Sequence, residues 1–313
     1  MTDSSSLVTE PEAAPLTAPH PGRIAAWIHA CRIPTLSAAV VPVLVGTVLA
    51  WRHESFEPFT ALATLLGAVA IQIGTNLAND LYDFKKGADS PARLGPPRAL
   101  ASGWLSVEDV RAGMVASFGL ATAAGAYLMA VAGWPILAIG LASIASGILY
   151  TAGPFALAYI GLGDLFVFLF FGLVAVLGTF YAQARTLDPE AWIAAIPVGT
   201  LATAILVVNN LRDIDTDRAA GKLTLAVRIG RRATRAEFAT LLVAAFAVPI
   251  ALWAQGLRSA WVLLPLATTT LAARTIQAVF ERADGPGLNR TLVDTAQLHL
   301  FFGLLFAAGL ALG

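Results

Sequence analysis

Apolar runs of roughly 20 residues recur along most of this chain, separated by short polar segments. A run of that length matches the hydrocarbon core of a bilayer, which is ~30 Å thick. Backbone groups in lipid must be paired within a helix or a closed barrel, and these runs lack the alternation of barrel strands. The predicted fold class is therefore all-α, a polytopic membrane protein. In agreement, only 13% of the 313 residues are charged, against roughly 25% in soluble domains.

Nine transmembrane helices in a bundle are predicted, at residues 35–52, 60–81, 107–130, 134–152, 160–183, 191–210, 237–255, 259–280 and 292–312. Together they form one domain, 23–313. All but Arg52, Arg185 and Arg258 of the 20 Lys and Arg fall on one side of these spans. The positive-inside rule makes that side cytoplasmic, which places the N-terminus inside a cell (inner or plasma) membrane and the C-terminus outside.

The N-terminal segment differs from the rest of the chain. Residues 1–22 are rich in Ser, Thr, Pro and Ala and carry no basic residue, so we predict a disordered cytoplasmic tail and no signal peptide. Residues 24–31 are expected to form a short interfacial helix. Cys31 is the single cysteine, which excludes internal disulfides and favours an interfacial packing role.

Two similar polar motifs interrupt the apolar pattern. They run from Asn76 to Asp89 and from Asn209 to Lys222. Asn76 and Asp80 align with Asn209 and Asp213 at one constant offset, and each pair is spaced i, i+4, so amide and carboxylate share a helix face. An even number of spans separates the motifs, which puts both at the same leaflet. This predicts an internal parallel repeat of four-helix units, completed by the ninth helix.

The motifs are unusually acidic. Asp83 and Asp217 each add a carboxylate about one turn after Asp80 and Asp213. Solvated helix ends are one interpretation. It explains the pair poorly, because negative charge at a helix C-terminus opposes the helix dipole and crowded carboxylates repel one another. Oxygen ligands without His or Cys favour Mg²⁺, so these four aspartates are the predicted metal ligands. Asp215 is an additional acid without an assigned role.

Basic residues follow both motifs, and acids together with bases suit a metal–diphosphate complex better than cation transport. Taken one at a time, these Lys and Arg are better explained as solvated, topology-setting charges than as ligands. Lys222 and Arg98 stand out, because each lies close after its motif, beside a Gly or Pro that can fold the loop back. Tyr82 and Tyr150 are the nearest aromatic residues, and an interfacial position explains them as well. His299 is interpreted as a neutral, hydrogen-bonded packing residue.

These motifs resemble those of the UbiA-type superfamily of intramembrane aromatic prenyltransferases, which carry two acidic motifs on a nine-helix bundle. The flanking sequence is most similar to the 1,4-dihydroxy-2-naphthoate polyprenyltransferases of menaquinone biosynthesis. The matching stretches are RIPTLS (32–37), PVLVG (42–46), TNLANDLYDFKKGAD (75–89), RLGPPRALASG (93–103), LYTAGPFALAYIGLGDLFVFLFFG (149–172) and NNLRDIDTDRAAGKLTLAVRIGRR (209–232). The Asp80-x-x-Asp83 step is shorter than the superfamily often uses, and it is typical of the quinone branch.

The resemblance implies a mechanism. A polyprenyl diphosphate would bind with its head at the cytoplasmic cavity and its tail in the bilayer, and two Mg²⁺ would be held by Asp80 and Asp83 and by Asp213 and Asp217. Tyr150 and the acidic motifs would stabilise an allylic cation. The prenyl group would replace the carboxylate of 1,4-dihydroxy-2-naphthoate, releasing CO₂ and diphosphate and giving a demethylmenaquinol. The implied diphosphate-binding residues are Asn76, Asn209, Lys222, Arg98 and Arg32.

Other functions remain possible at this stage. A related prenyltransferase would use 4-hydroxybenzoate, homogentisate, a chlorophyllide or a glycerol phosphate lipid as acceptor. A cation-coupled transporter also uses duplicated helices and membrane acids, but it predicts carboxylates near the bilayer midplane at broken helices. A structural scaffold would have no use for repeated acids. No nucleic-acid partner is expected.

Overall fold

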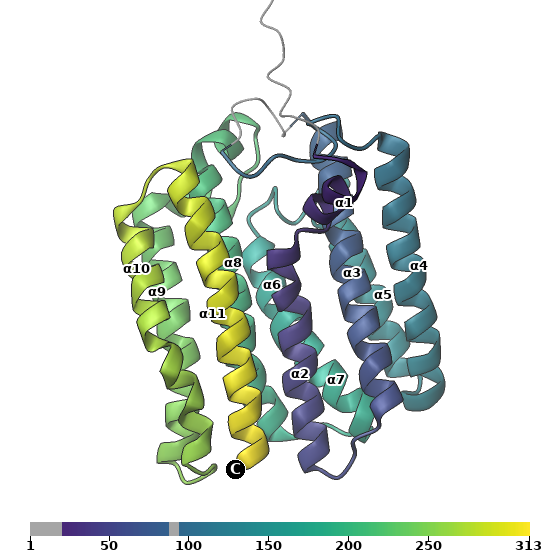
Figure 1. Cartoon of the computed structure of the whole chain (residues 1–313), viewed down its shortest axis with the longest axis vertical. Coiled ribbons are helices and arrows are strands. Elements are labelled where there is room, and N and C mark those ends of the chain that lie inside the picture. The colour runs from purple at the N-terminus through teal and green to yellow at the C-terminus, as the bar shows by residue number, and fades with distance from the viewer. Residues whose placement is uncertain (1–20, 88–93) are drawn as a thin grey trace, which may run out of the picture.

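The computed structural model describes residues 21–87 and 94–313, and over those ranges the chain is helical, with no strand. Most helices stand side by side in one bundle (Figure 1). Their bounds are α1 Arg23–Cys31, η1 Ile33–Leu36, α2 Ser37–Arg52, α3 Pro58–Lys85, α4 Val107–Ala132, α5 Trp134–Leu149, α6 Gly163–Val167, η2 Phe168–Val174, α7 Ala175–Ala184, α8 Pro189–Ala219, α9 Leu225–Ala254, η3 Ala260–Thr268, α10 Thr269–Glu281 and α11 Gly285–Leu312. The predicted tail lies outside the described residues up to residue 20, as do Asp89 and Arg93.

Eight stretches of these described ranges are long and apolar enough to cross a membrane. They are Ile33–Arg52, α3, α4, Gly163–Ala184, α8, α9, Ala260–Glu281 and α11. The remaining apolar helix, α5, has only 16 residues. The all-helical membrane fold is therefore confirmed, while a ninth span stays a prediction.

Two helices begin well before the predicted spans. α9 begins at Leu225 and not at 237, and α11 begins at Gly285 and not at 292. Hydropathy misses these starts because the first turns are polar, yet both are capped: the Thr224 hydroxyl accepts from the Val227 N–H, and the Asp284 carboxylate accepts from the Gly287 N–H. α9 is kinked at Gly230, whose φ of 79° is open to glycine at little cost.

α3 and α8 carry the acidic motifs and run through them without a break. Both helices continue past their apolar part, so the aspartates lie in their last turns. Each ends at a glycine with positive φ, Gly87 at 68° and Gly221 at 71°, an arrangement that stops helices. The two motif ends lie at the same end of the bundle, and the chain's C-terminus lies at the other end (Figure 1). This is the arrangement that a parallel repeat predicts.

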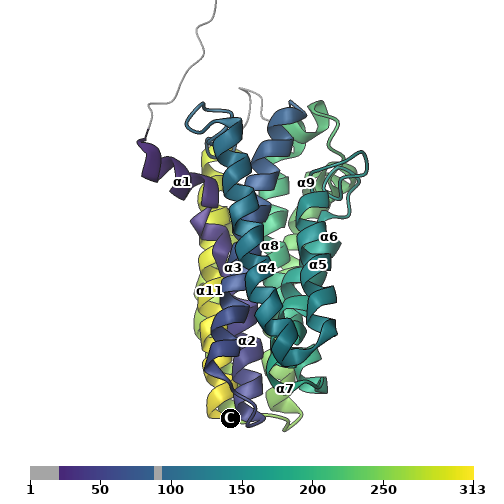
Figure 2. The same cartoon turned by 90° about the vertical axis from the view of Figure 1, so that its right-hand side faces the viewer.

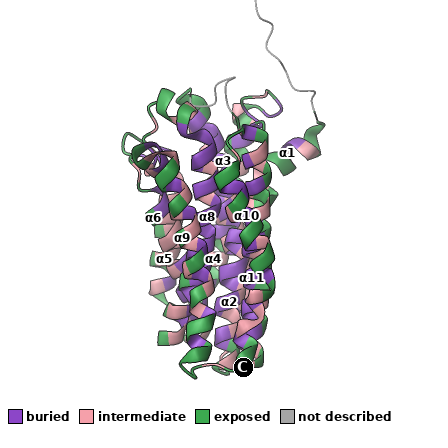
Figure 3. Cartoon of the chain, turned by 90° about the vertical axis from the view of Figure 1, so that its left-hand side faces the viewer, coloured by how far each residue is buried: buried purple, intermediate pink, exposed green. Residues whose placement is uncertain are grey.

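α8 is the central helix. Its side chains Val198, Leu201, Val208 and Leu211 are inaccessible to solvent and join residues of α2, α7, α9 and α11 in the largest hydrophobic cluster. Burial falls off toward the outer faces of the bundle (Figure 3), and many large apolar side chains are exposed, among them Leu62, Val115, Leu141 and Val243. Such an apolar outer surface is what a lipid-exposed bundle requires.

α1 projects from the motif end of the bundle (Figure 2). It occupies the residues predicted to form an interfacial helix, and Ile24 and Ile28 are exposed on it. The helix is fixed at its end, where the Asn76 amide of α3 donates to the Cys31 carbonyl at 3.0 Å. Arg32 follows in a left-handed conformation (φ 52°) and turns the chain into η1 and α2.

Candidate active site

A cavity of about 320 Å³ lies inside the bundle at its motif end and extends between α3, α4, α5, α7 and α8. Its polar wall consists of Arg32, Gln72, Asn76, Asn79, Asp83, Arg98, Tyr150, Asn209, Asn210 and Lys222. The rest of the lining is largely apolar and includes Val43, Ala68, Leu128, Ile136, Ile139, Phe166, Phe170 and Ile205. The cavity therefore joins a polar, charged end to an elongated apolar space.

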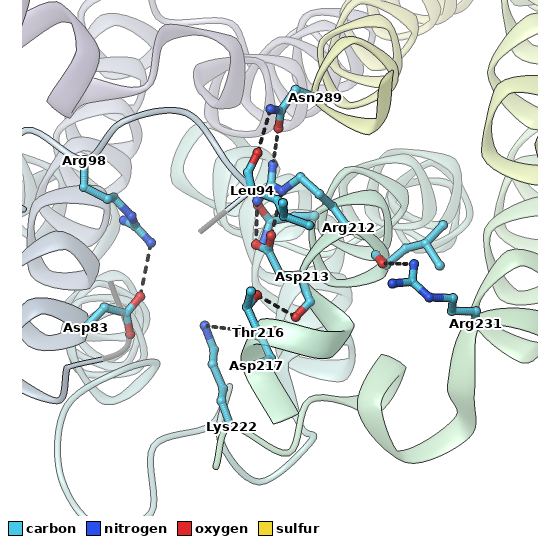
Figure 4. A network of polar contacts seen from close by, with 12 residues as sticks. Asp83, Leu94, Arg98, Arg212, Asp213, Thr216, Asp217, Lys222, Arg231 and Asn289 are labelled. Carbon is cyan, nitrogen blue, oxygen red and sulfur yellow. Dashed lines mark hydrogen bonds and ion pairs between the residues drawn. The ribbon is translucent and has the colours of Figure 1, made fainter. Parts of the chain in front are cut away.

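Asp83 is the carboxylate of the first motif that lines this cavity. One oxygen, Oδ2, accepts from Nη2 of Arg98 at 3.1 Å, and the other, Oδ1, accepts from the Tyr159 hydroxyl at 3.1 Å. Both Asp83 and Arg98 are buried (Figure 4). Asp80, one turn earlier, is also buried, and the Leu100 N–H points to its Oδ2 at 3.4 Å. The segment from Arg98 to Leu100 thus covers the first motif.

The second motif contains a buried ion pair. Arg212 donates to both oxygens of Asp213, from Nε at 2.7 Å and from Nη2 at 2.5 Å. The same guanidinium donates to the Asn209 side chain at 2.8 Å and to the Asn289 side chain of α11 at 2.7 Å (Figure 4). Arg212 is 2% exposed, so this carboxylate is neutralised by a fully buried partner.

Lys222 and Asp217 complete the polar end on the α8 side. Their charged atoms are 3.9 Å apart, and both side chains are largely buried. The Lys222 ammonium lies 5.5 Å from the centre of the Tyr159 ring, and the Lys86 ammonium lies 4.1 Å from it. Tyr159 therefore binds a carboxylate of the first motif through its hydroxyl and lies beside a lysine from each motif through its ring.

Sequence reasoning missed three of these residues. Tyr159 lies in the irregular segment between α5 and α6, and its stretch was noticed only as a whole in the resemblance. Arg212 is only one of several bases in the matching stretch 209–232, and Asn289 lies far along the chain from both motifs, in α11. A basic residue directly beside a motif aspartate was the available signal for Arg212. The sequence contains no comparable signal for Asn289.

The predicted site residues fall into two groups. Seven of them line the cavity: Arg32, Asn76, Asp83, Arg98, Tyr150, Asn209 and Lys222. Asp80, Asp213 and Asp217 adjoin this wall without being part of it among the described residues. Asn76 also has a structural task, since its amide donates to the Cys31 carbonyl and to the Thr35 hydroxyl.

Three further residues from the sequence analysis lie elsewhere. Asp215 points to the surface, where it pairs with Arg231 at 2.7 Å, so this additional acid is turned away from the cavity. His299 is fully buried, with its Nδ1 at 3.4 Å from the Ser37 hydroxyl, which agrees with a packing role. Tyr82 is half-buried at the same end of α3, beside the Lys85 ammonium.

Tyr150 is a neutral phenol in this environment. Burial raises its pKa well above the usual range, and the nearby carboxylates of Asp164, Asp83 and Asp217 raise it further. Its hydroxyl lies against Gly163, where a β-carbon would be 2.9 Å from the oxygen. Asp164, which was not singled out from the sequence, is itself buried. Tyr150 can therefore donate a hydrogen bond into the cavity but does not supply a phenolate.

The apolar side of the cavity is lined in part by a π-helical segment. η2 (Phe168–Val174) continues α6, and Phe166 stacks on Phe170 with ring centres 5.9 Å apart. This segment lies very close to α8, because Gly172 meets Gly199: a β-carbon on Gly172 would lie 2.6 Å from the Gly199 Cα. π-helical turns are frequent at functional sites, and here Phe170 and Phe171 of the segment line the cavity.

The donor set fits Mg²⁺. The carboxylate and amide side chains around the polar end offer oxygen, with no His or Cys among the described lining residues. Mg²⁺ prefers one or two carboxylates together with water and phosphate oxygens. Asp83, with Asp80 behind it, and Asp217 on the opposite helix are placed to supply them. Lys222 and Arg98 add the positive charge that a diphosphate requires.

Together, the helical bundle and this cavity define a membrane-embedded protein in which a charged, polar end is joined to an apolar interior. Comparison with known proteins identifies the family. Residues 39–302 match the UbiA prenyltransferase family, and the chain belongs to it. It is therefore an integral membrane prenyltransferase, and the resemblance seen in the sequence is confirmed.

Individual relatives agree with this assignment. The chain is 37% identical over 296 residues to 1,4-dihydroxy-2-naphthoate octaprenyltransferase of Escherichia coli (strain K12), covering 93% of this chain and 96% of that one. The apo structure of a UbiA homolog from Aeropyrum pernix K1 has a TM-score of 0.62 at 18% identity, covering 90% and 98%. A UbiA homolog from Archaeoglobus fulgidus, bound to DMAPP and Mg²⁺, has a TM-score of 0.57 at 15% identity, covering 90% and 99%.

Proposed function

We propose that this enzyme transfers a polyprenyl group from its diphosphate to 1,4-dihydroxy-2-naphthoate, with loss of CO₂ and diphosphate, to give a demethylmenaquinol. The observation that carries the proposal is the joining of a polar end, where both acidic motifs meet Lys222 and Arg98, to an apolar cavity. The acceptor is inferred from relatives such as the E. coli enzyme, whose name gives that substrate.

The residues have distinct tasks in this reaction. Lys222, Arg98 and Arg32 bind the diphosphate and oppose its growing negative charge as the C1–O bond breaks. Asp80, Asp83 and Asp217 would hold Mg²⁺, which when bound neutralises the diphosphate and makes it a better leaving group. Asp213, whose two carboxylate oxygens accept from Arg212, is proposed as a further ligand. The A. fulgidus homolog, bound to DMAPP and Mg²⁺, supports this cofactor.

The cavity walls control what the allylic cation meets. The apolar lining, with Phe166 and Phe170, excludes water that would otherwise quench the cation. Tyr150 and the carboxylates around it face the positive charge, and the cation is attacked by the electron-rich ring at the carbon that carries the carboxylate. The new C–C bond forms as the carboxylate leaves as CO₂, so the electron pair returns to the ring and no proton is lost.

The orientation in the membrane is part of the proposal. The motif end faces the cytoplasm of a cell membrane, the N-terminus is inside and the C-terminus outside, as the distribution of Lys and Arg favours. Residues 23–313 act as one domain behind a cytoplasmic tail, 1–22. Reporter fusions to the C-terminus would test this: alkaline phosphatase should be active there, and an active cytoplasmic reporter would contradict the orientation.

The test of the reaction uses membranes that contain the full chain. Geranylgeranyl diphosphate is supplied with 1,4-dihydroxy-2-naphthoate, with and without Mg²⁺, and prenylated product and CO₂ are measured. Asp83→Asn and Asp217→Asn should remove most activity, whereas Asp215→Asn, on the surface, should not. If product forms only with 4-hydroxybenzoate or homogentisate, the protein is still a prenyltransferase, but the proposed naphthoate acceptor is refuted. Absence of product with every acceptor, in folded protein that binds the donor, would refute the proposal.

A further inference from the structure

Asn289 joins three parts of the molecule that meet only at the polar end of the cavity. It lies in the second turn of α11, outside both four-helix repeats. Its Oδ1 accepts from Nη1 of Arg212 at 2.7 Å, and its Nδ2 donates to the Leu94 carbonyl at 3.0 Å (Figure 4). One side chain therefore contacts the second acidic motif and the segment that covers the first.

The Leu94 contact bears on the first motif. Four residues after Leu94, Arg98 binds Asp83, and the N–H of Leu100 points to Asp80. The anchor at Leu94 is close-packed, because a β-carbon on Gly285 of α11 would lie 3.0 Å from the Leu94 Cβ and 3.2 Å from its carbonyl oxygen. The start of α11 thus fixes the beginning of the segment that carries Arg98.

The Arg212 contact bears on the second motif. Arg212 divides its donors between Asp213, Asn209 and Asn289. The Asn289 oxygen takes the Nη1 donor, and the other groups are then presented to Asp213 and Asn209. Without this acceptor the guanidinium is free to turn, and it carries with it the Asp213 carboxylate beside the cavity wall and the Asn209 amide, which lines the cavity. Loss of a hydrogen bond to a charged group is costly when the group is buried.

We propose that Asn289 is a positioning residue for the prenyl-transfer site, which sets the two acidic motifs at the spacing that a metal–diphosphate head requires. This inference rests on the proposed function, since it assumes that the two motifs share one diphosphate. It assigns a task to the last helix, which otherwise only closes the bundle. Asn289 does not line the cavity and acts through Arg212 and the Leu94–Leu100 segment.

Asn289→Leu keeps the size of the side chain and removes both hydrogen bonds. We expect the Mg²⁺-dependent affinity for farnesyl diphosphate to fall about 10- to 100-fold, the usual effect of losing a residue that orients metal ligands. The measurement is donor binding to purified full-length protein in detergent, titrated with Mg²⁺. The thermal midpoint is measured alongside and should fall, because the buried Arg212 loses one hydrogen-bond acceptor, so donor binding is titrated well below the midpoint of the variant.

Two further variants keep the test informative. Thr295→Val is the matched control on α11, because its buried hydroxyl donates only to the Thr291 carbonyl within the same helix, and donor affinity should not change. Asn289→Asp keeps an acceptor for Arg212 and loses the donor to the Leu94 carbonyl. Its donor affinity should therefore lie between those of the unmodified protein and Asn289→Leu. It also serves as the test if Asn289→Leu does not fold.

The outcomes separate this inference from the proposed function. The positioning role would be overturned if Asn289→Leu and Asn289→Asp bound the donor as tightly as the unmodified protein and needed the same Mg²⁺ concentration. A lower thermal midpoint with unchanged donor affinity would also overturn it, because Asn289 would then serve stability alone. If the unmodified protein does not prenylate 1,4-dihydroxy-2-naphthoate, the proposed acceptor is wrong. The role of Asn289 is still tested in that case, because donor binding is measured without the acceptor.

Discussion

The Tyr159 hydroxyl donates to Asp83 at 3.1 Å while Arg98 occupies the other oxygen of the same carboxylate. Asp83 is therefore fixed from two directions, by two segments that come from different parts of the chain. The ring of Tyr159 lies beside the ammonium groups of Lys86 and Lys222 at the same time. This one residue orders the charged groups at the mouth of the cavity.

Tyr159→Phe removes the hydroxyl and keeps the ring. We expect prenyl transfer to fall about 10-fold, since Asp83 loses one of its two orienting contacts. Tyr159→Leu should lose more activity, because Lys86 and Lys222 then also lose the aromatic ring beside them. Tyr82→Phe is the control, and its initial rate should stay within about twofold. Equal rates for Tyr159→Phe and Tyr82→Phe would show that the contact to Asp83 is dispensable.

Arg98→Gln should destabilise the protein as well as inactivate it. The Arg98–Asp83 pair is buried, with 9% and 3% of the side chains exposed, and removal of the cation leaves a carboxylate without its charge partner. Breaking such a pair typically costs about 3–5 kcal/mol of folding free energy.

Mg²⁺ with diphosphate should restore part of this loss, because they supply positive charge next to Asp83. Thermal unfolding with and without Mg²⁺ and diphosphate measures the effect. A variant equally stable in both conditions would argue against a metal near Asp83. Arg218→Gln, which breaks an exposed pair with Asp215, should change stability by at most about 1 kcal/mol.

The fold was largely predictable from the sequence for a physical reason. Apolar length and backbone pairing in lipid leave helices as the only solution for this chain. The constant offset between Asn76 and Asn209 predicted two motifs at one end of the bundle, and both now line one cavity. The role of Arg98 was predictable because Arg98 follows the first motif closely in the chain, and its contact with Asp83 is therefore local.

The remaining parts of the site depend on contacts that no local pattern encodes. Tyr159 reaches Asp83 from an irregular segment, and Asn289 reaches Arg212 from the last helix. The charge of Asp213 suggested a ligand facing the cavity, but its neighbour Arg212 takes both carboxylate oxygens. The rotation of α8 about its axis, together with the partners of each aspartate, decides which carboxylate of the second motif lies nearest the cavity. The spacing of the aspartates in the sequence does not reveal that rotation.

Gly172→Ala tests the close approach of η2 to α8. The added methyl would lie 2.6 Å from the Gly199 Cα, so one backbone must move away. We expect a loss of about 1–3 kcal/mol or more from overpacking, together with lower activity as Phe170 and Phe171 shift in the cavity. Gly119→Ala on α4 is the control, with open space around the new carbon, and should be neutral or slightly stabilising. Similar thermal midpoints for both variants would contradict the close contact.

The protonation state of Tyr150 can be tested by the pH dependence of stability and activity. Its pKa is raised by burial first and then by Asp164, Asp83 and Asp217, since ionisation would add a fourth negative charge. The folded protein therefore retains this proton above pH ~10, where an unfolded tyrosine loses it. The unfolded state then binds fewer protons than the folded one, so the contribution of Tyr150 to stability declines as the pH rises past about 10.

Tyr150→Phe should lower kcat, because a residue that lines the cavity loses its hydroxyl, but the shape of the pH–rate profile from about pH 6 to about pH 10 should not change. If Tyr150 acted as a phenolate, activity of the unmodified enzyme would rise toward alkaline pH, and the variant would lack that rise. Transfer rates across this range for both proteins decide between the two roles. Stability above pH ~10 should decline less steeply in Tyr150→Phe, since the variant has no proton to release there on unfolding.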